Sequence, residues 1–249
     1  MLNIMLCGCG GRMGAAVIAA AREAGDRVVA GVDINPAADS PFPIFTSPEE
    51  FQGKADVIVD FSHHSALPGL LDYAIATGTP LVVCTTGHTE EETAAMKAAS
   101  EKVAVFFSRN MSLGINLLIS LCRRAAAALG TDFDIEIIEK HHNKKLDAPS
   151  GTALMIADAI SEGEERAYVY DRHAERRQRA KGEIGLHAVR GGTIVGEHEV
   201  LFCGKDEVIT LSHSAASREV FATGALRAAH FMAGKSAGFY NMDDVVGDL

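Results

Sequence analysis

The chain contains no tryptophan, and aromatic residues make up only 6% of it. It also lacks a cysteine pattern typical of a disulfide framework. Its five cysteines are odd in number and lie mostly in apolar runs, as reduced thiols of cytosolic proteins do. Cys7 and Cys9 have no second pair at zinc-binding spacing, so we expect no metal.

An excess of positive charge, a basic leader and a long apolar run are missing as well. The net charge of -10 disfavours a nucleic-acid binder, which normally carries a basic face. No apolar run approaches the roughly 18 residues of a membrane span. We therefore expect a cytoplasmic protein with no nucleic-acid or membrane partner, in which local clusters of cations hold any anionic ligand.

Hydrophobic residues make up 47% of the 249 residues, enough for one large core or two ordinary ones. Short apolar runs alternate with helical patterns from the start of the chain. The runs are 2–7, 28–32, 57–61, 81–84 and 103–107, and the helical patterns are 13–24, 67–76 and 89–100. This alternation predicts an α/β domain over residues 1–109, with a Rossmann-like doubly wound parallel sheet. Thr89 and Glu92 are spaced as a capping box for the helix at 89–100.

A glycine-rich turn, Gly8-Cys9-Gly10-Gly11-Arg12-Met13-Gly14, joins the first predicted strand to the first helix. Such a turn lets backbone N–H groups approach a pyrophosphate closely. Its spacing departs from G-x-G-x-x-G and follows Gly8-x-x-Gly11-x-x-Gly14 instead, and glycines at such a turn can also serve packing alone. Asp33 favours the dinucleotide reading, because it follows the second strand near the ~20-residue spacing of a ribose-binding carboxylate.

The sequence after Asp33 predicts a preference for NADH over NADPH. Ile34 comes next, and no lysine or arginine follows before Lys54. A 2′-phosphate would lie beside the carboxylate, and only Arg12 could reach across to neutralise it.

Two further loops follow strands at the edge where open α/β sheets bind ligands. Phe61-Ser62-His63-His64 follows the third strand and Cys84-Thr85-Thr86-Gly87-His88 the fourth. Their small residues and hydroxyls suit a nicotinamide ribose, with Thr86 and Gly87 the strongest candidates. The three histidines are equally well explained as polar loop ends or parts of a helix cap.

The segment Ser108-Arg109-Asn110-Met111-Ser112 marks the crossing to a second domain. A helix at 115–129 and a strand at 133–139 are expected there, followed by strands at 185–190, 193–202 and 207–212. This order predicts an α+β domain with a mixed or antiparallel sheet. The last helix, at 217–232, could pack on either domain. The six basic residues of 166–181 indicate a solvated face, or alternatively a positively charged lid over an anionic substrate.

Residues 139–153 gather two histidines, three lysines and a Ser-Gly-Thr step between apolar runs. In a continuous strand His141 and Lys145 would share a face about 13 Å apart, so the chain is expected to turn between them. An imidazole can exchange protons near neutral pH, and an ammonium can hold a carboxylate or donate a proton. A lone histidine is usually structural, but His141 and His142 with Lys145 indicate a reactive site.

Ser150 is a natural N-cap for a helix at 153–160. The backbone N–H groups at Gly151 and Thr152, at the positive end of that helix, could hold a carboxylate. The alternative is a capped helix with no ligand. A cap does not require glycine at position 151, whereas close approach of a carboxylate does.

Taken together, these motifs resemble the dihydrodipicolinate reductase family. The resemblance rests on the glycine-rich turn and on the stretch from Glu139 to Ala153, which is highly specific. Further matching segments extend it over essentially the whole chain: Thr85-Thr86-Gly87, Asn110-Met111-Ser112, Val189-Arg190-Gly191-Gly192, Val195-Gly196-Glu197-His198, Ser217-Arg218 and Met242-Asp243-Asp244-Val245.

The resemblance implies NAD(P)H-dependent reduction of 4-hydroxy-tetrahydrodipicolinate in lysine and diaminopimelate biosynthesis. Hydride would pass to C4 of a cyclic, unsaturated dicarboxylate imine, and the resulting enamine would then be protonated. His141 matches the proposed acid, Lys145 a second acid or carboxylate contact, and His142 a substrate neighbour, with Ser150, Gly151 and Thr152 in the carboxylate-binding turn. The expected cofactor residues are Gly8, Gly11, Arg12, Met13, Gly14, Asp33, Phe61, Thr85, Thr86, Gly87, Ser108, Asn110 and Met111.

The resemblance also implies that residues 219–249 return to the dinucleotide-binding domain and that 110–218 bind substrate and form a homotetramer. Two departures from the family pattern stand near the expected cofactor site. Cys84 replaces a glycine before Thr-Thr-Gly, and Ser108-Arg109 replaces Ala-Pro. Two alternatives are another two-domain nicotinamide-dependent reductase and a non-catalytic NADH-sensing regulator. The regulator would need a basic recognition element and would have no use for the pair His141 and Lys145.

Overall fold

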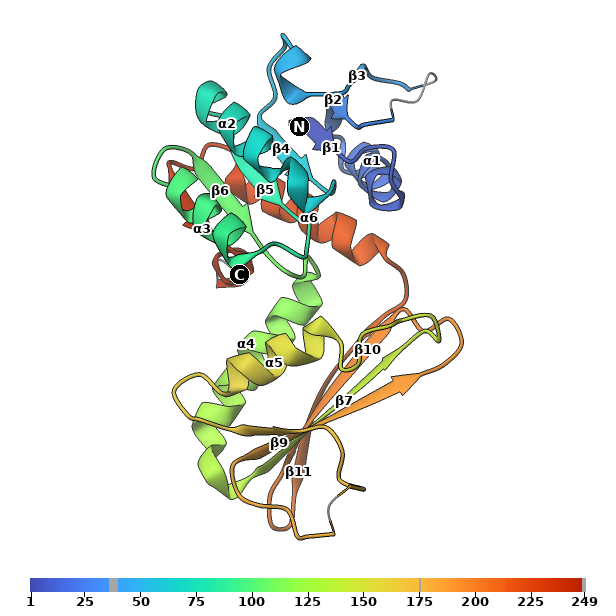
Figure 1. Cartoon of the computed structure of the whole chain (residues 1–249), viewed down its shortest axis with the longest axis vertical. Helices are drawn as coiled ribbons and strands as arrows, with labels where there is room; N and C mark the ends of the chain where they lie inside the picture. Colours follow the sequence, from blue (N-terminus) through green and yellow to red (C-terminus); the bar gives the residue numbers. More distant parts are fainter. Residues whose placement is uncertain (36–39, 175, 248–249) are drawn as a thin grey trace. The chain divides into compact units, whose positions relative to one another are not determined.

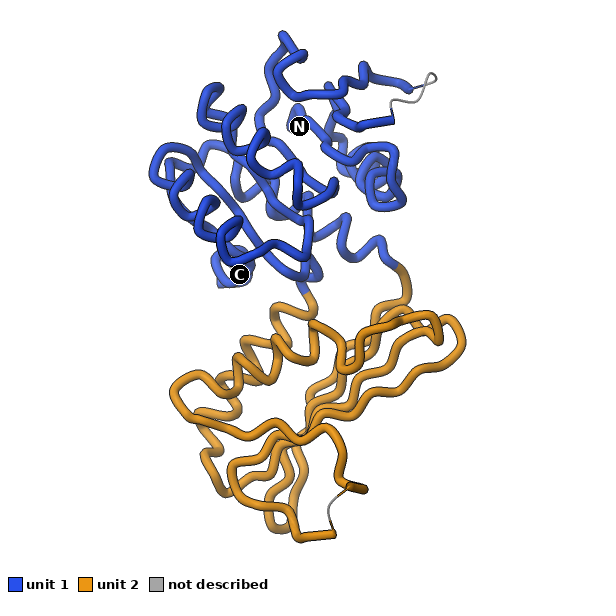
Figure 2. The backbone as a smooth tube through the Cα atoms, viewed as in Figure 1, with its two compact units in different colours: residues 1–113, 218–249 blue, residues 114–217 orange. Residues whose placement is uncertain are grey.

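The computed structural model describes residues 1–35, 40–174 and 176–247. The chain forms two compact units (Figure 2). Unit 1 comprises Met1–Leu113 and Arg218–Leu249, and unit 2 comprises Gly114–Ser217. The chain therefore leaves unit 1 once, builds unit 2 from one continuous segment and returns.

Unit 1 is built on a seven-stranded sheet whose pairings are all parallel, in the order β12-β6-β5-β4-β1-β2-β3 (Figure 1). This is the doubly wound order, with a switch point between β1 and β4, and it confirms the predicted Rossmann-like fold. The strands are β1 (Asn3–Cys7), β2 (Arg27–Val32), β3 (Ile44–Phe45), β4 (Val57–Asp60), β5 (Leu81–Val83), β6 (Ala104–Phe107) and β12 (Gly238–Tyr240).

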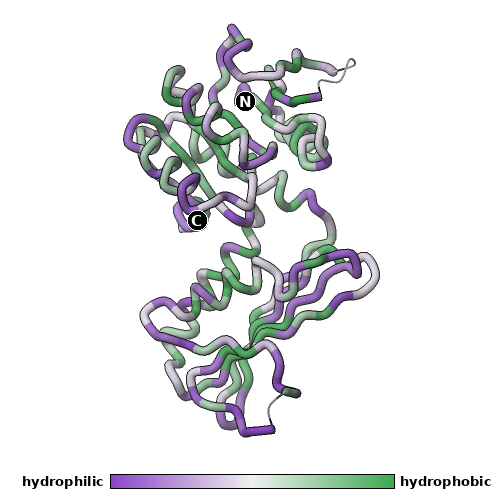
Figure 3. The backbone as a smooth tube through the Cα atoms, viewed as in Figure 1, coloured by the Kyte–Doolittle hydropathy of each residue, from purple (hydrophilic) through white to green (hydrophobic). Residues whose placement is uncertain are grey.

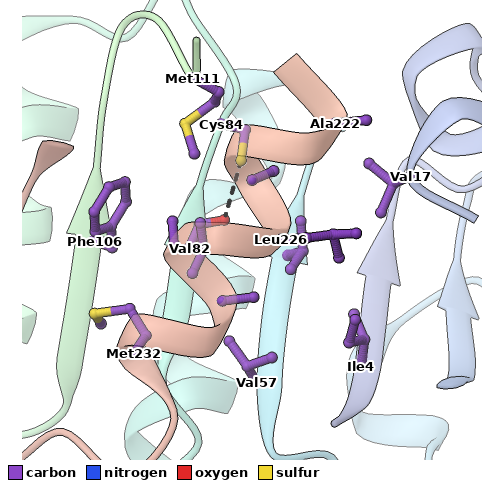
Figure 4. Packing of buried hydrophobic residues seen from close by; sticks show 14 of the residues in the cluster. Ile4, Val17, Val57, Val82, Cys84, Phe106, Met111, Ala222, Leu226 and Met232 are labelled. Carbon is purple, nitrogen blue, oxygen red and sulfur yellow. Dashed lines mark hydrogen bonds between the residues drawn. The ribbon is translucent and has the colours of Figure 1, made fainter. Parts of the chain in front are cut away.

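Helices cover both faces of this sheet, so its central strands are buried and hydrophobic (Figure 3). On one face α1 and α6 pack on Ile4, Val57 and Phe106 (Figure 4), and on the other α2 and α3 pack on Met5 and Ile58. The helices are α1 (Arg12–Ala24), α2 (Leu67–Thr77), α3 (Glu90–Ala99), α6 (Glu219–Met232) and α7 (Met242–Gly247), with 3-10 turns η1 (Pro48–Glu50) and η2 (His64–Ala66). The last predicted helix, α6, thus belongs to the core of unit 1.

Local sequence signals located most of these elements. The capping box of α3 is present, because Thr89 accepts from the Glu92 N–H while Glu92 accepts from the Thr89 N–H. The elements β3, β12 and α7 were not predicted. Strands of two or three residues are too short to show an alternation, and α7 has only six residues.

Unit 2 has a five-stranded mixed sheet in the order β11-β10-β7-β9-β8. Strand β9 runs parallel to β7 and β8, whereas β10 runs antiparallel to β7 and β11. The strands are β7 (Asp134–His141), β8 (Ala167–Val169), β9 (Glu183–Arg190), β10 (Gly196–Cys203) and β11 (Val208–Ala215). Helices α4 (Leu113–Leu129) and α5 (Gly151–Ile160) cover one face of it (Figure 1), and η3 (Gly130–Asp132) follows α4. The predicted mixed sheet is confirmed.

Helix α4 corrects one expectation. Within the described residues the helical stretch Leu113–Asp132 is long and apolar enough to cross a membrane, judged by length and composition alone. We expected no segment of that length. The helix buries Ile115, Leu118 and Cys122 in the core of unit 2, as a core helix does.

The basic segment 166–181 is partly solvent-exposed and partly bonded to the sheet of unit 2. Its first residues include the short strand β8, and three of its arginines pair with carboxylates of the unit 2 sheet. Arg179 bonds Asp134 and Glu136, and Arg172 bonds Glu136 and Glu183. Glu183 is 4% exposed, so these arginines are structural partners of the sheet. Arg176 and Lys181 are exposed, as a solvated face predicts.

Candidate active site

The glycine-rich turn is shaped by contacts within unit 1. Gly8 has a φ of 75°, and a Cβ there would lie 2.5 Å from the carbonyl oxygen of Phe61. A Cβ on Gly14 would lie 2.5 Å from the carbonyl oxygens of Gly8 and Cys9. Gly11 is the N-cap of α1 and provides no side-chain cap. At the positive end of α1 the turn therefore presents backbone N–H groups, and its glycines add no side chains there.

A cavity of about 650 Å³ adjoins this turn. That size is ordinary for a small-ligand or cofactor site. Four predicted cofactor residues line it, namely Gly8, Gly11, Asp33 and Phe61, together with residues of η1 and η2. Asp33 is held beside the turn, because it accepts from the N–H of Gly10 at 2.9 Å and of Asn35 at 3.0 Å.

The loop after β5 is anchored by a buried carboxylate. Asp60, at the end of β4, is 1% exposed and accepts from the Thr85 hydroxyl at 2.8 Å and from the Ser62 N–H at 2.9 Å. Burial raises the pKa of Asp60, and the hydrogen bonds from Ser62 and Thr85 offset part of that rise. Thr85 is therefore a buried anchor, while Thr86 and Gly87 lie exposed beyond it. The sequence reading missed Asp60.

The histidines of these loops have structural partners. His64 Nδ1 lies 2.8 Å from Glu92, which completes the capping box of α3, and His88 Nδ1 lies 3.3 Å from the same carboxylate. The His88 ring also packs edge-on against Phe107. These contacts favour the helix-cap interpretation for His64 and His88.

The segment after β6 forms a hydrogen-bonded turn. Ser108 donates its hydroxyl to the carbonyl of Asn110 at 2.8 Å, and the Asn110 side chain accepts from the N–H of Ser112 at 2.9 Å. Met111 is 3% exposed and lies in the core of unit 1 (Figure 4). Its side chain is therefore a packing group, and of the other predicted residues Arg12 is exposed and Met13 half-buried.

In unit 2 the helix-facing side of the sheet changes from apolar to polar along the strands. Ile135 and Ile137 of β7 lie in the core, and the next two residues on that face are Glu139 and His141. Across the strands His198 pairs with Glu139 and Arg190 pairs with His141, and Gly196 lies against the His141 ring. We call this end of the sheet the polar corner, defined by Glu139, His141, Arg190 and His198 together with Ser150.

Glu139 is the centre of the polar corner, and its side chain is fully buried. One oxygen lies 2.6 Å from His141 Nδ1 and accepts from Arg190 at 2.8 Å. The other accepts from Arg190 at 2.6 Å and from the Ser150 N–H at 3.0 Å. Burial raises the pKa of Glu139, but hydrogen bonds from Arg190, His141 and Ser150 outweigh it and leave that pKa below its ordinary value.

His141 is 9% exposed, and a Cβ on Gly196 would lie 3.1 Å from its Nε2. Burial lowers its pKa, and the charges of Lys145 and Arg190 act in the same direction. Glu139 raises the pKa of His141 but does not cancel these effects. In the protein without ligand, His141 therefore stays neutral down to a lower pH than an ordinary histidine.

Ser150 joins the polar corner to α5. Its hydroxyl oxygen caps the helix by accepting from the Ala153 N–H at 3.2 Å and lies 3.1 Å from His198 Nε2. His198 is 4% exposed, and its Nδ1 has no hydrogen-bond partner among the described residues. Burial, followed by the charge of His141, lowers the pKa of His198 to about 4. Ser150 is thus the predicted N-cap, although the helix begins at Gly151 rather than Ala153.

The chain turns after His141, as expected. The N–H of Lys145 bonds the carbonyl of His142 at 3.2 Å. The Lys145 ammonium lies 2.9 Å from Asp147, and hydrogen bonds from Lys145 and the Gly151 N–H help to hold the pKa of Asp147 below its ordinary value. The turn thus brings Lys145 to the N-terminus of α5, in the same loop as His141.

The structure therefore gathers the predicted residues into two places. The cavity of unit 1 contains Gly8, Gly11, Asp33 and Phe61, and unit 2 holds His141 and Ser150 in the polar corner, with Lys145 and Gly151 linked through Asp147. His142 is half-buried in the turn, and Thr152 lies in the first turn of α5. Among the residues the structure describes, no cluster of three or more His, Cys, Asp or Glu side chains could hold a metal.

Three residues of the polar corner, Glu139, Arg190 and His198, were not predicted as site residues. Strand alternation could have found Glu139, because it lies two residues before His141 and so shares its face. Arg190 and His198 reach the site through the pairing of β9 and β10 with β7, which no local pattern reveals.

Comparison with known proteins identifies the family. Residues 2–111 match dihydrodipicolinate reductase, N-terminus, and residues 114–246 match dihydrodipicolinate reductase, C-terminus. A 4-hydroxy-tetrahydrodipicolinate reductase from Caldanaerobacter subterraneus subsp. tengcongensis is 53% identical, over 99% of this chain and 98% of the relative. One from Clostridium tetani is 47% identical, over 98% and 96%.

A solved structure agrees with these matches. Dipicolinate-bound dihydrodipicolinate reductase from Paenisporosarcina sp. TG-14 superimposes with a TM-score of 0.82 at 25% identity, over 97% of both chains. Sequence and fold thus agree over both units, and the chain belongs to the dihydrodipicolinate reductase family.

Proposed function

We propose that this chain is a 4-hydroxy-tetrahydrodipicolinate reductase of lysine and diaminopimelate biosynthesis. It uses a reduced nicotinamide nucleotide to convert 4-hydroxy-tetrahydrodipicolinate into tetrahydrodipicolinate, with the 4-hydroxyl leaving as water. Relatives that carry the name of this activity match nearly the whole chain. The structural observation that supports the proposal is the polar corner with Lys145 beside it, because it combines a proton-exchanging imidazole with cations for a dicarboxylate.

The residues of unit 1 fit a nicotinamide dinucleotide. The N-terminus of α1, without a side-chain cap, suits the pyrophosphate, and Asp33 at the border of the cavity suits the adenosine ribose. We infer that Gly8, Gly11, Arg12 and Gly14 hold the pyrophosphate side. The exposed Thr86 and Gly87, with the turn around Ser108 and Asn110, serve the nicotinamide side. When bound, the reduced nicotinamide supplies the hydride.

In unit 2 we assign the substrate to the polar corner and the N-terminus of α5. The relative from Paenisporosarcina binds dipicolinate, a planar dicarboxylate of the same class as the proposed substrate. Lys145 and the backbone at Gly151 and Thr152 would hold one carboxylate, with the partial positive charge of α5 behind them. His142 and Ser150 border the same place.

His141 is assigned as the acid that protonates the enamine after hydride transfer. Its pKa lies below the ordinary value in the unliganded protein, so few molecules carry the imidazolium at neutral pH. A bound dicarboxylate adds negative charge near the ring and Lys145, which favours the imidazolium. Substrate binding would therefore prepare the acid by drawing a proton onto His141.

The activity is tested by following NADH oxidation in the presence of enzymatically generated 4-hydroxy-tetrahydrodipicolinate. We expect turnover that depends on both the substrate and the protein. Absence of turnover, with NADH binding intact and dipicolinate not bound, would contradict the proposal.

We further propose that NADH is preferred over NADPH. Asp33 and Glu49 both border the cavity, and the sequence offers no lysine or arginine between Asp33 and Lys54. A 2′-phosphate would meet carboxylates there, with only Arg12 to balance them. The expected kcat/KM ratio is about tenfold or more in favour of NADH, which corresponds to about 1.4 kcal/mol. A clear preference for NADPH would show that Arg12 or another cation dominates.

The assembly proposed for the chain is a homotetramer formed through unit 2. Its support is the sheet face opposite α4 and α5, where Val189 and Val208 are 45% and 56% exposed. Light scattering on the purified protein measures the number of chains directly. A monomer would contradict the proposed tetramer but would not bear on the proposed activity.

A further inference from the structure

Glu139 has no proposed part in binding substrate or cofactor, although its side chain makes four hydrogen-bond contacts at the centre of the polar corner. It is fully buried, and its two oxygens meet His141, both terminal nitrogens of Arg190 and the backbone N–H of Ser150. Burying a carboxylate is costly unless every oxygen is paired, and here each oxygen has two partners. The simplest explanation is a buried ion pair that stabilises the fold.

The identity of the partners points beyond stability. A carboxylate accepts hydrogen bonds only, so the 2.6 Å contact requires a proton on His141 Nδ1. Nε2 is then the nitrogen left to exchange a proton, and Gly196 leaves space next to it. The second oxygen of Glu139 holds the Ser150 N–H at the start of α5, so one carboxylate sets both the acid and the carboxylate-binding helix end.

We propose that Glu139 is the positioning residue of the active site, fixing the tautomer and orientation of His141 and tying it to the N-terminus of α5. The proposal rests on the function proposed above. Arg190 serves Glu139 in turn, because its bidentate contact and its bond to the Asp147 carbonyl leave the carboxylate one orientation.

The electrostatic consequence separates this role from simple stabilisation. The negative charge of Glu139 favours the imidazolium of His141, while Arg190 on β9 and Lys145 in the following turn oppose it. His198 on β10 faces the same ring at 5.3 Å, and Asp147 pairs with Lys145. Glu139 is the group that raises the pKa of His141, so removing the carboxylate would lower that pKa further. The pH above which activity falls would then move down.

The variant Glu139→Gln removes the charge at nearly constant shape. We expect kcat to fall on the order of 10- to 100-fold with the KM for NADH little changed. The alkaline limb of the pH profile should move down by about one pH unit or more. Proton uptake on binding dipicolinate, measured by calorimetry in buffers of different ionisation enthalpy, should shrink.

Glu136→Gln is the matched control, because Glu136 lies on the same strand and also bonds two arginines and a histidine. It is on the opposite face of the sheet, away from His141. We expect it to cost stability while leaving the pH profile and the proton uptake at wild-type values.

Three outcomes decide the proposal. The proposal is overturned if Glu139→Gln keeps the wild-type pH dependence and proton uptake. It is also overturned if the decrease of kcat in Glu139→Gln is no larger than in Glu136→Gln. If Glu139→Gln does not fold, Glu139→Asp decides instead. The shorter acid keeps the charge but cannot reach both His141 and Ser150, so kcat should fall roughly tenfold with the pH limb in place, and wild-type kcat would overturn the proposal. An inactive wild type that binds NADH but not dipicolinate refutes the proposed function itself.

Discussion

The chemistry of each residue in the polar corner depends on the atoms that its partners leave available. Glu139 occupies Nδ1 of His141, so Nε2 remains for substrate. Asp147 pairs with the Lys145 ammonium, but 58% of the Asp147 side chain is exposed. A ligand can therefore compete with Asp147 for the lysine. Both groups proposed to act on the substrate are therefore held in position, each with an atom left for a ligand.

Replacing either group should affect catalysis more than cofactor binding. His141→Gln removes the proton donor, and Lys145→Ala removes the cation proposed to hold a carboxylate. Each should lower kcat on the order of 100-fold, as expected for loss of a general acid or of its alignment. NADH binding, followed by fluorescence titration, should stay within about twofold of wild type. Lost NADH affinity would place these residues in the cofactor site or in the folding core.

Residue types and spacing marked the local part of this candidate site. The motif from Glu139 to Ala153 carries His141, Lys145 and Ser150 within one turn and one cap, so the sequence could bring these three candidates together. The partners on β9 and β10 could not, because strand pairing joins residues about 50 positions apart in sequence. The burial of Met111 was missed for a similar reason, since α6 returns from the end of the chain to pack there.

At the scale of elements, the chain leaves the N-terminus of α5 open around Gly151. A Cβ on Gly151 would meet no atom within 4 Å, and its φ is not in the left-handed region. The chain's own packing therefore does not require glycine at this position. That freedom is expected where a ligand must approach the backbone closely.

Gly151→Ala tests this directly. The methyl group should weaken dipicolinate binding on the order of tenfold, a change of about 1.4 kcal/mol. The thermal midpoint should stay the same or rise slightly, since alanine suits a helix better than glycine. Gly247→Ala, at the end of α7 and equally open, serves as the control and should leave binding unchanged. Unaltered binding in Gly151→Ala would mean that the carboxylate lies elsewhere.

The turn before α5 holds a carboxylate of its own at the proposed anion site. Asp147 pairs with Lys145 and takes the Gly151 N–H, so a bound carboxylate must displace it or lie beside a like charge. Asp147→Asn should therefore tighten dipicolinate binding roughly fivefold at low salt, the value of a modest surface ion pair. The gain should shrink in high salt, where such charges are screened. Weaker binding would show that Asp147 instead holds the turn in its active shape.

The architecture of the whole molecule was the easiest level to predict. Continuous apolar strands alternating with amphipathic helices specify a parallel sheet covered on both faces, and a run of strands after them specifies a separate sheet. Some features needed the structure itself, two of them inside the sheets. The strand β12 adds to the sheet of unit 1 from the end of the chain, and segment 166–181 supplies arginines to the unit 2 sheet.

The polar corner also makes the stability of the folded chain depend on pH. The pKa of His198 is lowered to about 4, so the fold keeps it neutral while the unfolded chain takes up a proton below its ordinary value near 6.5. The contribution of His198 to the free energy of unfolding is fully present above about pH 6.5. It is lost as pH falls toward 4, by roughly 3 kcal/mol in all. His141 and His213, whose pKa values burial also lowers, act in the same direction.

His198→Gln isolates this contribution, because the amide can keep the contact with Ser150 but cannot take up a proton. The variant should be less stable than wild type at pH 7.5, owing to altered packing, and the difference should narrow or reverse by pH 5. Thermal midpoints at several pH values and one protein concentration measure it. His213 is a half-buried neighbour of His198 on β11. For His213→Gln, the difference in thermal midpoint from wild type should change less between pH 7.5 and pH 5. A constant difference between wild type and His198→Gln across this range would show that His198 is already charged in the folded protein.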